Sequence, residues 1–506
     1  MLKLIDYYLD RITMYRLVLY SLIILLFIAS LFGIFNGVAY SPLTIVLSSL
    51  FLVAVGWMAN KIFAWAFDAP ANVESVYITT LILALIISPA QSFSELPFLA
   101  WAAILAILSK FVLAINKKHI FNPAAIAVVI TSFALGDSAS WWVGTTWMTP
   151  FVAIVGFLII RKLRFTDLAW SFFMTFGVVC VLLSLLKGNN PLTTLQQVVL
   201  HSSMLFMGSI MLTEPMTMPP TKRLQMIFGG LVGVLAVPQF NILGFFFTPE
   251  MALCVGNIFA YIVSPKGKFL LFLDEKIAVS TDVIDFIFKP QRRLAYQPGQ
   301  YMEWTLQHPH TDSRGNRRYF TLASSPTEDT IRLGVRISPN GSSYKKALKD
   351  IDEKNLVVGA QLAGDFTLPK NKKQKLVFMA GGIGITPFRS MIRYLIDKNE
   401  KRDIVLFYSN KTEDEIAYKE VFAQAQEKIG AKIVYTLTNL EAVPADWNGE
   451  RGRVAAEMIR RKVPDFAERM FYLSGPQVMV QAYENSIRQL GVKRAMLKKD
   501  FFPGLV

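Results

Sequence analysis

Residues 376–391 read Leu-Val-Phe-Met-Ala-Gly-Gly-Ile-Gly-Ile-Thr-Pro-Phe-Arg-Ser-Met, and they decide the fold of the half in which they lie. Four apolar residues typical of a strand run into closely spaced glycines, which let a backbone turn tightly against a phosphate. Proline in the next segment suits the first turn of a helix. The order of strand, turn and helix predicts a phosphate-binding cofactor site on Gly381, Gly382, Ile383, Gly384, Ile385, Thr386 and Pro387.

Strands alternate with helical segments around this turn. The predicted strands are 375–380, 403–408, 432–438 and 469–473. Such alternation is typical of a parallel, doubly wound α/β sheet. Upstream, short segments of alternating polarity, bounded by Gly, Pro and Asn, predict an antiparallel β-barrel. Its strands are expected at 276–278, 282–289, 300–306, 318–323 and 331–336.

The predicted barrel contains a second binding pattern, Arg317-Arg-Tyr-Phe-Thr-Leu-Ala-Ser-Ser-Pro326. Strand alternation places Arg318 and Phe320 on one face, with Thr321 adjacent. An arginine can hold a pyrophosphate with two hydrogen bonds, an aromatic ring can stack on a flavin, and a hydroxyl can hydrogen-bond the flavin edge. A helix start nearby can add backbone N–H groups for the same pyrophosphate. That turn contains Gly341, Ser342 and Ser343.

A third turn ends the strand predicted at 469–473. It reads Ser474-Gly475-Pro476 and would lie at the carboxyl edge of the sheet, where ligands of open sheets bind. The chain ends in an aromatic tail that contains Phe501 and Phe502.

Residues 267–506 resemble the ferredoxin–NADP reductase superfamily over their whole length. Its Arg-x-Tyr/Phe-Ser/Thr signature falls on 318–321, its nicotinamide-nucleotide loop on 381–388, and its Cys-Gly-Pro turn on 474–476, where serine replaces cysteine. The resemblance implies FAD on the first motif and NAD(P)H on the other two. It implies catalytic roles for Phe320, Thr321, Ser474 and a terminal ring, Phe501 or Phe502, that covers the flavin until nicotinamide displaces it.

The choice between NADH and NADPH stays open. Arg389 and the segment Ser409-Asn-Lys411 could each serve a 2′-phosphate or simply face solvent.

The N-terminal half has the composition of a membrane domain. Hydrophobic residues make up 53% of the chain and charged residues only 18%, which excludes an ordinary soluble enzyme. Residues 1–268 hold 15 Lys and Arg and 9 Asp and Glu, against 37 and 28 in residues 269–506. The uncharged stretch 17–60 would, as one helix at ~1.5 Å per residue, be about twice the ~30 Å hydrocarbon thickness, so it predicts two spans. Counting such stretches up to residue 265 predicts ten spans.

Basic residues between these spans predict the orientation, because Lys and Arg are retained on the cytoplasmic side. With the N-terminus inside, fourteen Lys and Arg of residues 1–268 lie in cytoplasmic segments and one, Lys187, lies outside. This predicts a multi-pass protein of a prokaryotic-type cytoplasmic membrane, with both termini cytoplasmic. Much of the net charge of +15 then orients the spans, so nucleic acid is not an expected partner.

Two cysteines exclude a disulfide framework or a four-cysteine iron–sulfur centre within this chain, and no metal site is expected.

Three polar stretches interrupt the apolar background. They are the Phe-Asn-Pro-Ala-Ala of 121–125, the Val-Gly-Thr-Thr of 143–146 and the Thr-Glu-Pro-Met-Thr-Met-Pro-Pro-Thr of 213–221. In this order they resemble the family of the D subunit of the Rnf electron-transport complex and the B subunit of the sodium-translocating NADH:quinone reductase. The resemblance covers about 60–265 and implies a ten-helix subunit that holds flavin and passes electrons across the bilayer. Its expected cofactor contacts are Asn122, Thr146, Glu214 and Thr217.

One feature departs from that family. Its members attach FMN covalently to the last threonine of an Asp-x-x-Ser/Thr-Gly-Ala-Thr motif, which is absent from residues 1–268. A flavin of the membrane domain, FMN or riboflavin, is therefore expected to be held non-covalently, if one is present.

The sequence as a whole predicts three domains: a membrane flavin and electron-transfer domain at 1–266, an FAD-binding β-barrel at 267–369 and an NAD(P)-binding α/β domain at 370–506. The expected function is an FAD-dependent NAD(P)H oxidoreductase that passes electrons into the membrane domain. The expected acceptor is a quinone, a flavoprotein or another extracytoplasmic acceptor, and membrane lipid is an expected partner.

Two alternatives stay open. A ferric-reductase or NADPH-oxidase-like haem protein has the same domain order, but residues 1–268 contain only His119 and His201, predicted at opposite faces. A transporter or ion pump coupled to a redox domain would fit the Asn-Pro and Pro-Pro breaks, which are typical of discontinuous helices.

Overall fold

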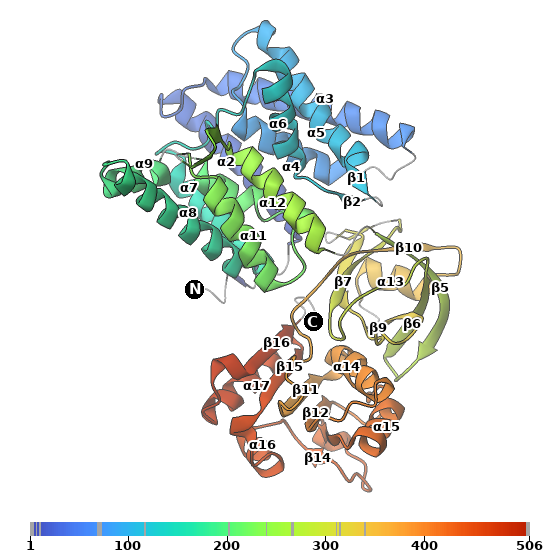
Figure 1. Ribbon diagram of the computed structural model, residues 1–506. Coiled ribbons are helices and arrows are strands. Elements are labelled where there is room, and N and C mark those ends of the chain that lie inside the picture. The colour runs from blue at the N-terminus through green and yellow to red at the C-terminus, as the bar shows by residue number, and fades with distance from the viewer. Residues whose placement is uncertain are drawn as a thin grey trace. The chain divides into compact units, whose positions relative to one another are not determined.

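A computed structural model describes residues 5–501, apart from 7, 10, 11, 68–72, 116, 117, 201, 202, 239, 265–267, 310, 313, 314, 339 and 340. The chain divides into two compact units, Met1–Gly267 and Lys268–Val506. Each unit is described by itself below (Figure 1).

The first unit is a bundle of apolar helices. Its principal helices are α2 (Met14–Ile34), α3 (Pro42–Ala66), α4 (Val73–Ile86), α5 (Leu96–Val112), α6 (Pro123–Leu135), α7 (Thr149–Leu163), α8 (Thr166–Leu186), α9 (Pro191–Leu200), α11 (Lys222–Leu235) and α12 (Pro249–Val263). Two short hairpins join them, β1–β2 (Ala114–Ile115, Lys118–His119) and β3–β4 (Asn241–Ile242, Phe245–Phe246).

Polar residues followed by proline start several of these helices. Ser41 precedes Pro42 and caps α3, Asn122 precedes Pro123 and caps α6, and Thr248 caps α12. Each cap side chain accepts a backbone N–H of the first turn, and proline at the first position loses no hydrogen bond. The Ser-Pro and Asn-Pro pairs of the sequence therefore mark helix starts inside the bundle.

Four helices of the described residues are long and apolar enough to cross a membrane by length and composition: Met14–Ile34, Pro42–Ala66, Phe93–Val112 and Thr166–Leu186. Other apolar helices, such as Pro123–Leu135 and Pro249–Val263, are shorter than a bilayer requires. Within the predicted stretch 188–213 the described residues form α9, the short α10 (Met204–Phe206) and a π-helix, Met207–Met211. The count of ten spans therefore stays a prediction.

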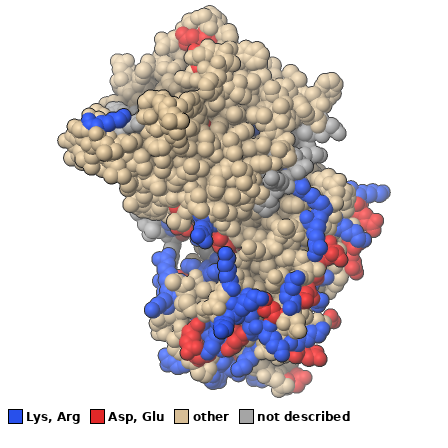
Figure 2. Space-filling view, viewed as in Figure 1, with Lys and Arg blue, Asp and Glu red and all other residues tan. Residues whose placement is uncertain are grey.

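The two units differ in surface chemistry. On the face drawn in Figure 2 the helical unit is almost free of charged side chains, whereas the second unit carries many of both signs. The helical unit also exposes large apolar side chains, including Phe27, Trp65 and Leu186. This is the surface expected of a protein whose helices face lipid.

The second unit begins with a six-stranded antiparallel sheet. Its strands are β5 (Phe269–Ala278), β6 (Val283–Pro290), β7 (Tyr301–Leu306), β8 (Arg317–Thr321), β9 (Ile331–Arg336) and β10 (Leu356–Ala363), in the spatial order β8-β7-β10-β5-β6-β9. Helix α13 (Ser343–Asp350) packs against its core through Tyr344 and Leu348. The edge strands β8 and β9 share no ladder, although the N–H of Ala323 donates to Arg332 O at 2.9 Å beyond the end of β8. Antiparallel pairing is thus observed, closure into a barrel stays a prediction, and β10 was not predicted.

The chain then forms a parallel sheet in the order β14-β13-β12-β11-β15-β16. Its strands are β11 (Leu376–Gly381), β12 (Ile404–Asn410), β13 (Lys432–Leu437), β14 (Glu450–Arg451), β15 (Met470–Gly475) and β16 (Leu497–Phe501). Helices α14 (Thr386–Asp397) and α15 (Lys419–Ile429) pack against one face, and α16 (Ala456–Lys462) and α17 (Gln477–Gln489) against the other (Figure 1).

Alternate residues of strand β11 pack against these two helical layers. Phe378 and Ala380 face the α14–α15 layer, and Val377 and Met379 face the α16–α17 layer. Burial on both faces explains why the strands read as nearly continuous apolar runs. The predicted doubly wound sheet is confirmed, whereas β14 and β16 were not predicted.

Candidate functional site: a flavin strand and a nucleotide turn

Strand β8 carries the residues expected to bind flavin. The side chain of Thr321 is buried, and among the described residues its Oγ1 has no hydrogen-bond partner. The ring of Phe320 is half-buried and lies 6.0 Å from the ring of Tyr344 on α13. A buried hydroxyl without a partner costs free energy, so Thr321 is suited to a polar ligand atom at this position.

Arg318 and the start of α13 converge on one anionic group. The guanidinium of Arg318 donates to both carboxylate oxygens of Asp312, at 3.1 and 3.4 Å, and the backbone N–H of Ser343 donates to Asp312 Oδ2 at 3.3 Å. Ser342 caps α13, and Gly341 lies in the turn before it, where its N–H donates to Ser338 O. The structure therefore brings the predicted pyrophosphate donors together around a carboxylate that the sequence did not single out.

The glycine turn follows β11 as predicted. A one-turn 3₁₀ helix, Gly382–Ile385, leads directly into α14, with Pro387 in the first turn. Gly382 has φ +51°, a left-handed conformation that favours glycine. A Cβ on Gly384 would lie 2.5 Å from the carbonyl oxygen of Ser474, so only glycine fits that contact.

The Ser-Gly-Pro turn therefore lies directly beside the glycine turn. Ser474 pairs with Ala380 across the parallel sheet, is fully buried, and its Oγ has no partner in the part of the chain that the structure describes. Pro476 precedes the first residue of α17. The backbone of Phe501 pairs with Gly475 in β16, while Phe502 lies outside the described residues. The role of either ring over the flavin stays a prediction.

Arg389 is not available to bind a nucleotide phosphate. Arg389 is only 5% exposed, and its guanidinium donates to both carboxylate oxygens of Glu328 and to the carbonyl oxygen of Ala323. Ser409 and Asn410 are buried at the end of β12, so Lys411 is the exposed member of that trio. Arg389 is therefore removed from the candidates for a 2′-phosphate, because its guanidinium is buried and bonded inside the fold.

The structure adds Arg336 to the site. Its guanidinium nitrogen lies 3.1 Å from where a Cβ of Gly382 would stand, which places a cation beside the glycine turn. Arg336 also pairs with Asp282 at 2.7 Å and with Glu415 at 3.2 Å. The only sequence signal was an arginine at the end of the strand before the 338–343 turn.

The interior of this unit contains a buried charge cluster. Asp285 is fully buried, accepts from Arg332 at 2.7 Å and from the Tyr418 hydroxyl at 2.5 Å. Burial raises the pKa of the Asp285 carboxyl, and the hydrogen bonds from Arg332 and Tyr418 oppose that rise. Burial likewise raises the pKa of Tyr418.

In the helical unit, three of the four expected flavin contacts lie in one polar cluster. His119 Nε2 lies 3.1 Å from Glu214 Oε1, and Thr217 donates to the same carboxylate at 3.3 Å. Asn122 donates through its backbone to Asn257 Oδ1 at 2.8 Å and through its side chain to Met211 O.

Thr146 is the exception among the four. It is exposed and follows the far end of α6, whose 13 residues make a helix about 20 Å long starting beside Asn122. Thr146 therefore belongs to the segment after α6, whereas Asn122 lies at the start of that helix.

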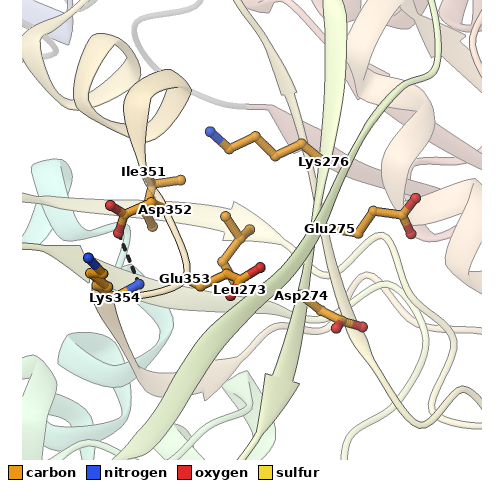
Figure 3. Close-up of a pocket in the computed structure, with 8 residues that line it drawn as sticks. All are labelled: Leu273, Asp274, Glu275, Lys276, Ile351, Asp352, Glu353 and Lys354. Atoms are coloured by element: carbon orange, nitrogen blue, oxygen red, sulfur yellow. Dashed lines mark hydrogen bonds between the residues drawn. The ribbon is translucent and has the colours of Figure 1, made fainter.

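An acidic depression of the second unit does not suit an anionic nucleotide (Figure 3). Four of its eight lining residues are Asp or Glu, from β5 and from the segment after α13. Figure 3 shows the Lys354 backbone bonded to Asp352, at 2.9 Å. In the described part of the chain, no group of three or more His, Cys, Asp or Glu is placed to hold a metal ion.

Comparison with known proteins agrees with this geometry. Residues 378–485 match the family described as the oxidoreductase NAD-binding domain. The chain is 25% identical over 251 residues to a flavohemoprotein of Rhodopirellula baltica, covering 47% of this chain and 61% of that protein. It is 26% identical over 234 residues to a glycine betaine monooxygenase reductase subunit of Chromohalobacter salexigens, covering 44% and 60%. The chain thus spans about 60% of the length of these curated relatives.

Two solved structures match a similar share of the chain. The chain matches the FAD/NAD-binding domain of a Vibrio cholerae nitric oxide dioxygenase at TM-score 0.41 and 21% identity, covering 46% of this chain and 98% of that one. It matches the cytochrome b5 reductase domain of Ulva prolifera nitrate reductase at TM-score 0.41 and 20% identity, covering 46% and 97%. The resemblance of residues 60–265 to membrane flavoprotein subunits stays a prediction.

The residues of the second unit fit FAD and a nicotinamide nucleotide. Thr321 Oγ1 and Ser474 Oγ are buried hydroxyls without partners in the described structure, and Arg318 and Ser343 are donors already aimed at an anion. Glycine at 384 lets the turn 381–384 approach the backbone of Ser474 and Gly475 closely, so the two predicted nucleotide-binding turns lie side by side.

Proposed function

We propose that this chain is an FAD-dependent NAD(P)H oxidoreductase anchored in a membrane. Two buried hydroxyls that have no partner among the described residues carry the proposal. Thr321 Oγ1 lies on the predicted flavin strand and Ser474 Oγ lies beside the predicted nucleotide turn. The match of 378–485 to an oxidoreductase NAD-binding domain supports it.

Each site residue has a role in this proposal. Arg318 and the backbone N–H of Ser343 hold the FAD pyrophosphate, Phe320 packs against the flavin ring and Thr321 hydrogen-bonds its edge. The turn 381–387 and Arg336 hold the nicotinamide-nucleotide phosphates, and Ser474 contacts the nicotinamide side. Bound flavin would supply the chemistry, since it accepts a hydride from NAD(P)H and releases electrons singly. The protein orients the two rings and excludes water.

Flavin spectroscopy tests this proposal directly. Purified protein in detergent should show flavin absorbance near 450 nm that is bleached anaerobically by NADH or NADPH. Extraction and chromatography should give FAD. Protein that holds no FAD when supplied with it, or whose flavin neither nucleotide reduces, would contradict the proposal.

For the first unit we propose a multi-pass membrane domain with both termini cytoplasmic, which passes electrons to a quinone, a flavoprotein or an extracytoplasmic acceptor. The three-domain division at 266 and 369 belongs to the same proposal. Asn257 supports a polar ligand in this unit, because it is fully buried. Its Oδ1 accepts the backbone N–H of Asn122, but within the described residues its Nδ2 has no partner. A non-covalent FMN or riboflavin would contact Asn122, Glu214 and Thr217.

Acid precipitation tests the membrane flavin. A second flavin beside FAD should appear in the supernatant and should be lost in Asn122→Ala. Yellow colour that stays on the precipitated chain and disappears in Thr146→Ala would instead indicate covalent attachment.

A further inference from the structure

Helix α14 is hydrogen-bonded to the residues that directly follow Thr321. Arg389 donates to the carbonyl oxygen of Ala323 at 3.0 Å, and Ser390 Oγ donates to the carbonyl oxygen of Ser324 at 2.5 Å. Both acceptors lie within three residues of Thr321 and are buried. The helix therefore contacts the backbone that fixes the position of the flavin strand.

An ion pair between the buried Arg389 and the partly buried Glu328 reinforces this contact. Arg389 binds Glu328 through two guanidinium nitrogens, and Glu328 Oε2 also accepts the backbone N–H of Ser325 at 2.6 Å. The guanidinium lies 5.9 Å from the ring centroid of Tyr418, whose hydroxyl donates to Asp285. One arginine thus joins the segment 323–328, α14 and the buried cluster around Asp285.

The nucleotide turn leads into this same end of α14. Thr386, the first residue of α14, directly follows the 3₁₀ turn Gly382–Ile385. Arg389 stands three residues later, about 4.5 Å along the helix axis at ~1.5 Å per residue. The first turn of one rigid helix therefore carries both the nucleotide turn and the contact to the flavin strand.

Stability alone is a poor reason for such a pair. Arg389 is buried and Glu328 is partly buried, so both charges lose hydration, and apolar side chains of similar volume often stabilise a fold as well or better. A bidentate arginine–carboxylate pair does impose a fixed geometry, because the planar guanidinium accepts only one arrangement of the two oxygens. Hydride transfer between two bound rings depends steeply on such geometry.

We infer that Arg389, with Glu328 and Ser390, is a positioning residue that sets the nicotinamide-nucleotide turn against the flavin strand. It touches neither cofactor and acts through α14 and the backbone of 323–325. This inference rests on the proposed function, since it assigns the residues that make the proposed hydride transfer efficient.

The test compares full-length variants loaded with FAD. Arg389→Met and Arg389→Lys remove the bidentate pair, Glu328→Gln weakens it, and Ser390→Ala removes the second bond to the flavin segment. The matched control is Arg488→Met, which removes an exposed intrahelical pair with Glu484 on α17. Stopped-flow reduction of FAD by NADH or NADPH gives the saturating rate and the half-saturating concentration, and the long-wavelength charge-transfer band reports ring stacking.

Arg389→Met should lower the saturating rate of FAD reduction at least tenfold and weaken the charge-transfer band. Its FAD content and half-saturating concentration should stay within about threefold of wild type, as should every measurement on Arg488→Met. The saturating rate of FAD reduction should fall by a smaller factor in Arg389→Lys, Glu328→Gln and Ser390→Ala.

Three results would overturn the inference. They are an unchanged saturating rate in Arg389→Met, a loss confined to nucleotide affinity, and a fall in thermal stability without a fall in rate. If Arg389→Met does not fold, Glu328→Gln and Ser390→Ala decide by the same criteria. Wild-type protein whose FAD is not reduced would instead refute the proposed function.

Discussion

Arg318 is the residue on which FAD retention should depend most. Arg318→Ala removes the guanidinium aimed at an anion beside the start of α13, so FAD content and NAD(P)H oxidation should both fall at least tenfold. The neighbouring Arg317→Ala is the control, since Arg317 pairs with Glu303. Flavin extraction and an anaerobic reduction assay measure both quantities. Wild-type flavin content in Arg318→Ala would contradict the assignment.

Asp312 should oppose the binding of FAD. Its carboxylate occupies the donors of Arg318 and Ser343, so a pyrophosphate must displace it. Asp312→Asn removes the competing charge, and FAD affinity should rise several-fold in titrations of the apoprotein followed by flavin fluorescence. Weaker binding in Asp312→Asn would show that Asp312 instead helps to orient Arg318.

At the scale of elements, the turn between β11 and α14 depends on a close approach of two backbones. A Cβ at Gly384 would lie 2.5 Å from Ser474 O and 2.6 Å from Gly475 Cα, so Gly384→Ala must displace one turn from the other. The half-saturating NAD(P)H concentration should rise at least tenfold, with FAD content retained. The control is Gly177→Ala in α8, where nothing lies within 4 Å of the added atom.

The loop before β15 should make the fold sensitive to acid. The hydrogen bond from Arg469, with that from Lys375, holds the pKa of Asp465 below its ordinary value of 3.8. Because the folded pKa is depressed, this stabilisation is present above the ordinary value and is lost as the pH falls through the folded pKa. Asp465→Asn should cost under about 1 kcal/mol at pH 7, since the pair is partly exposed, and should reduce the loss of stability on acidification. Thermal unfolding midpoints of wild type and Asp465→Asn, taken from pH 7 downward, measure this loss of stability. An acid dependence in Asp465→Asn equal to that of wild type would contradict the assignment.

At the scale of the whole molecule, the proposed orientation makes NAD(P)H oxidation one-sided. Inside-out membrane vesicles should oxidise added NAD(P)H, whereas sealed right-side-out vesicles should do so only after permeabilisation. Equal rates in both preparations before permeabilisation would contradict cytoplasmic termini.

The division into two compact units predicts that residues 268–506 can be produced alone. This fragment should retain FAD and reduce ferricyanide with NAD(P)H, because its sheets and cores are complete within those residues. An insoluble or FAD-free fragment would contradict that expectation.

The sequence predicted local features well. Strands β7, β9, β11 and β13 lie within about a residue of their expected bounds, because apolar alternation and flanking glycines report local geometry directly. Strand β10 was not predicted, and the structure identifies it by its pairing with β5 and β7, whose residues lie over fifty positions away along the chain. The uncharged stretch 188–213 contains α9, α10 and the π-helix, because composition records apolarity but not where a helix starts or ends, and its count as one span stays a prediction.

The sequence alone determined which residue types could hold a dinucleotide and in what order along the chain they stand, because glycine turns and strand alternation are local properties. Tertiary structure alone decided which of them share a site. It removed Arg389 from the phosphate candidates by burying it against Glu328, added Arg336 beside Gly382 and placed Asp312 on the predicted anion donors. Charge partners come from distant segments, so a side chain's availability is a property of packing and cannot be read from its own position in the sequence.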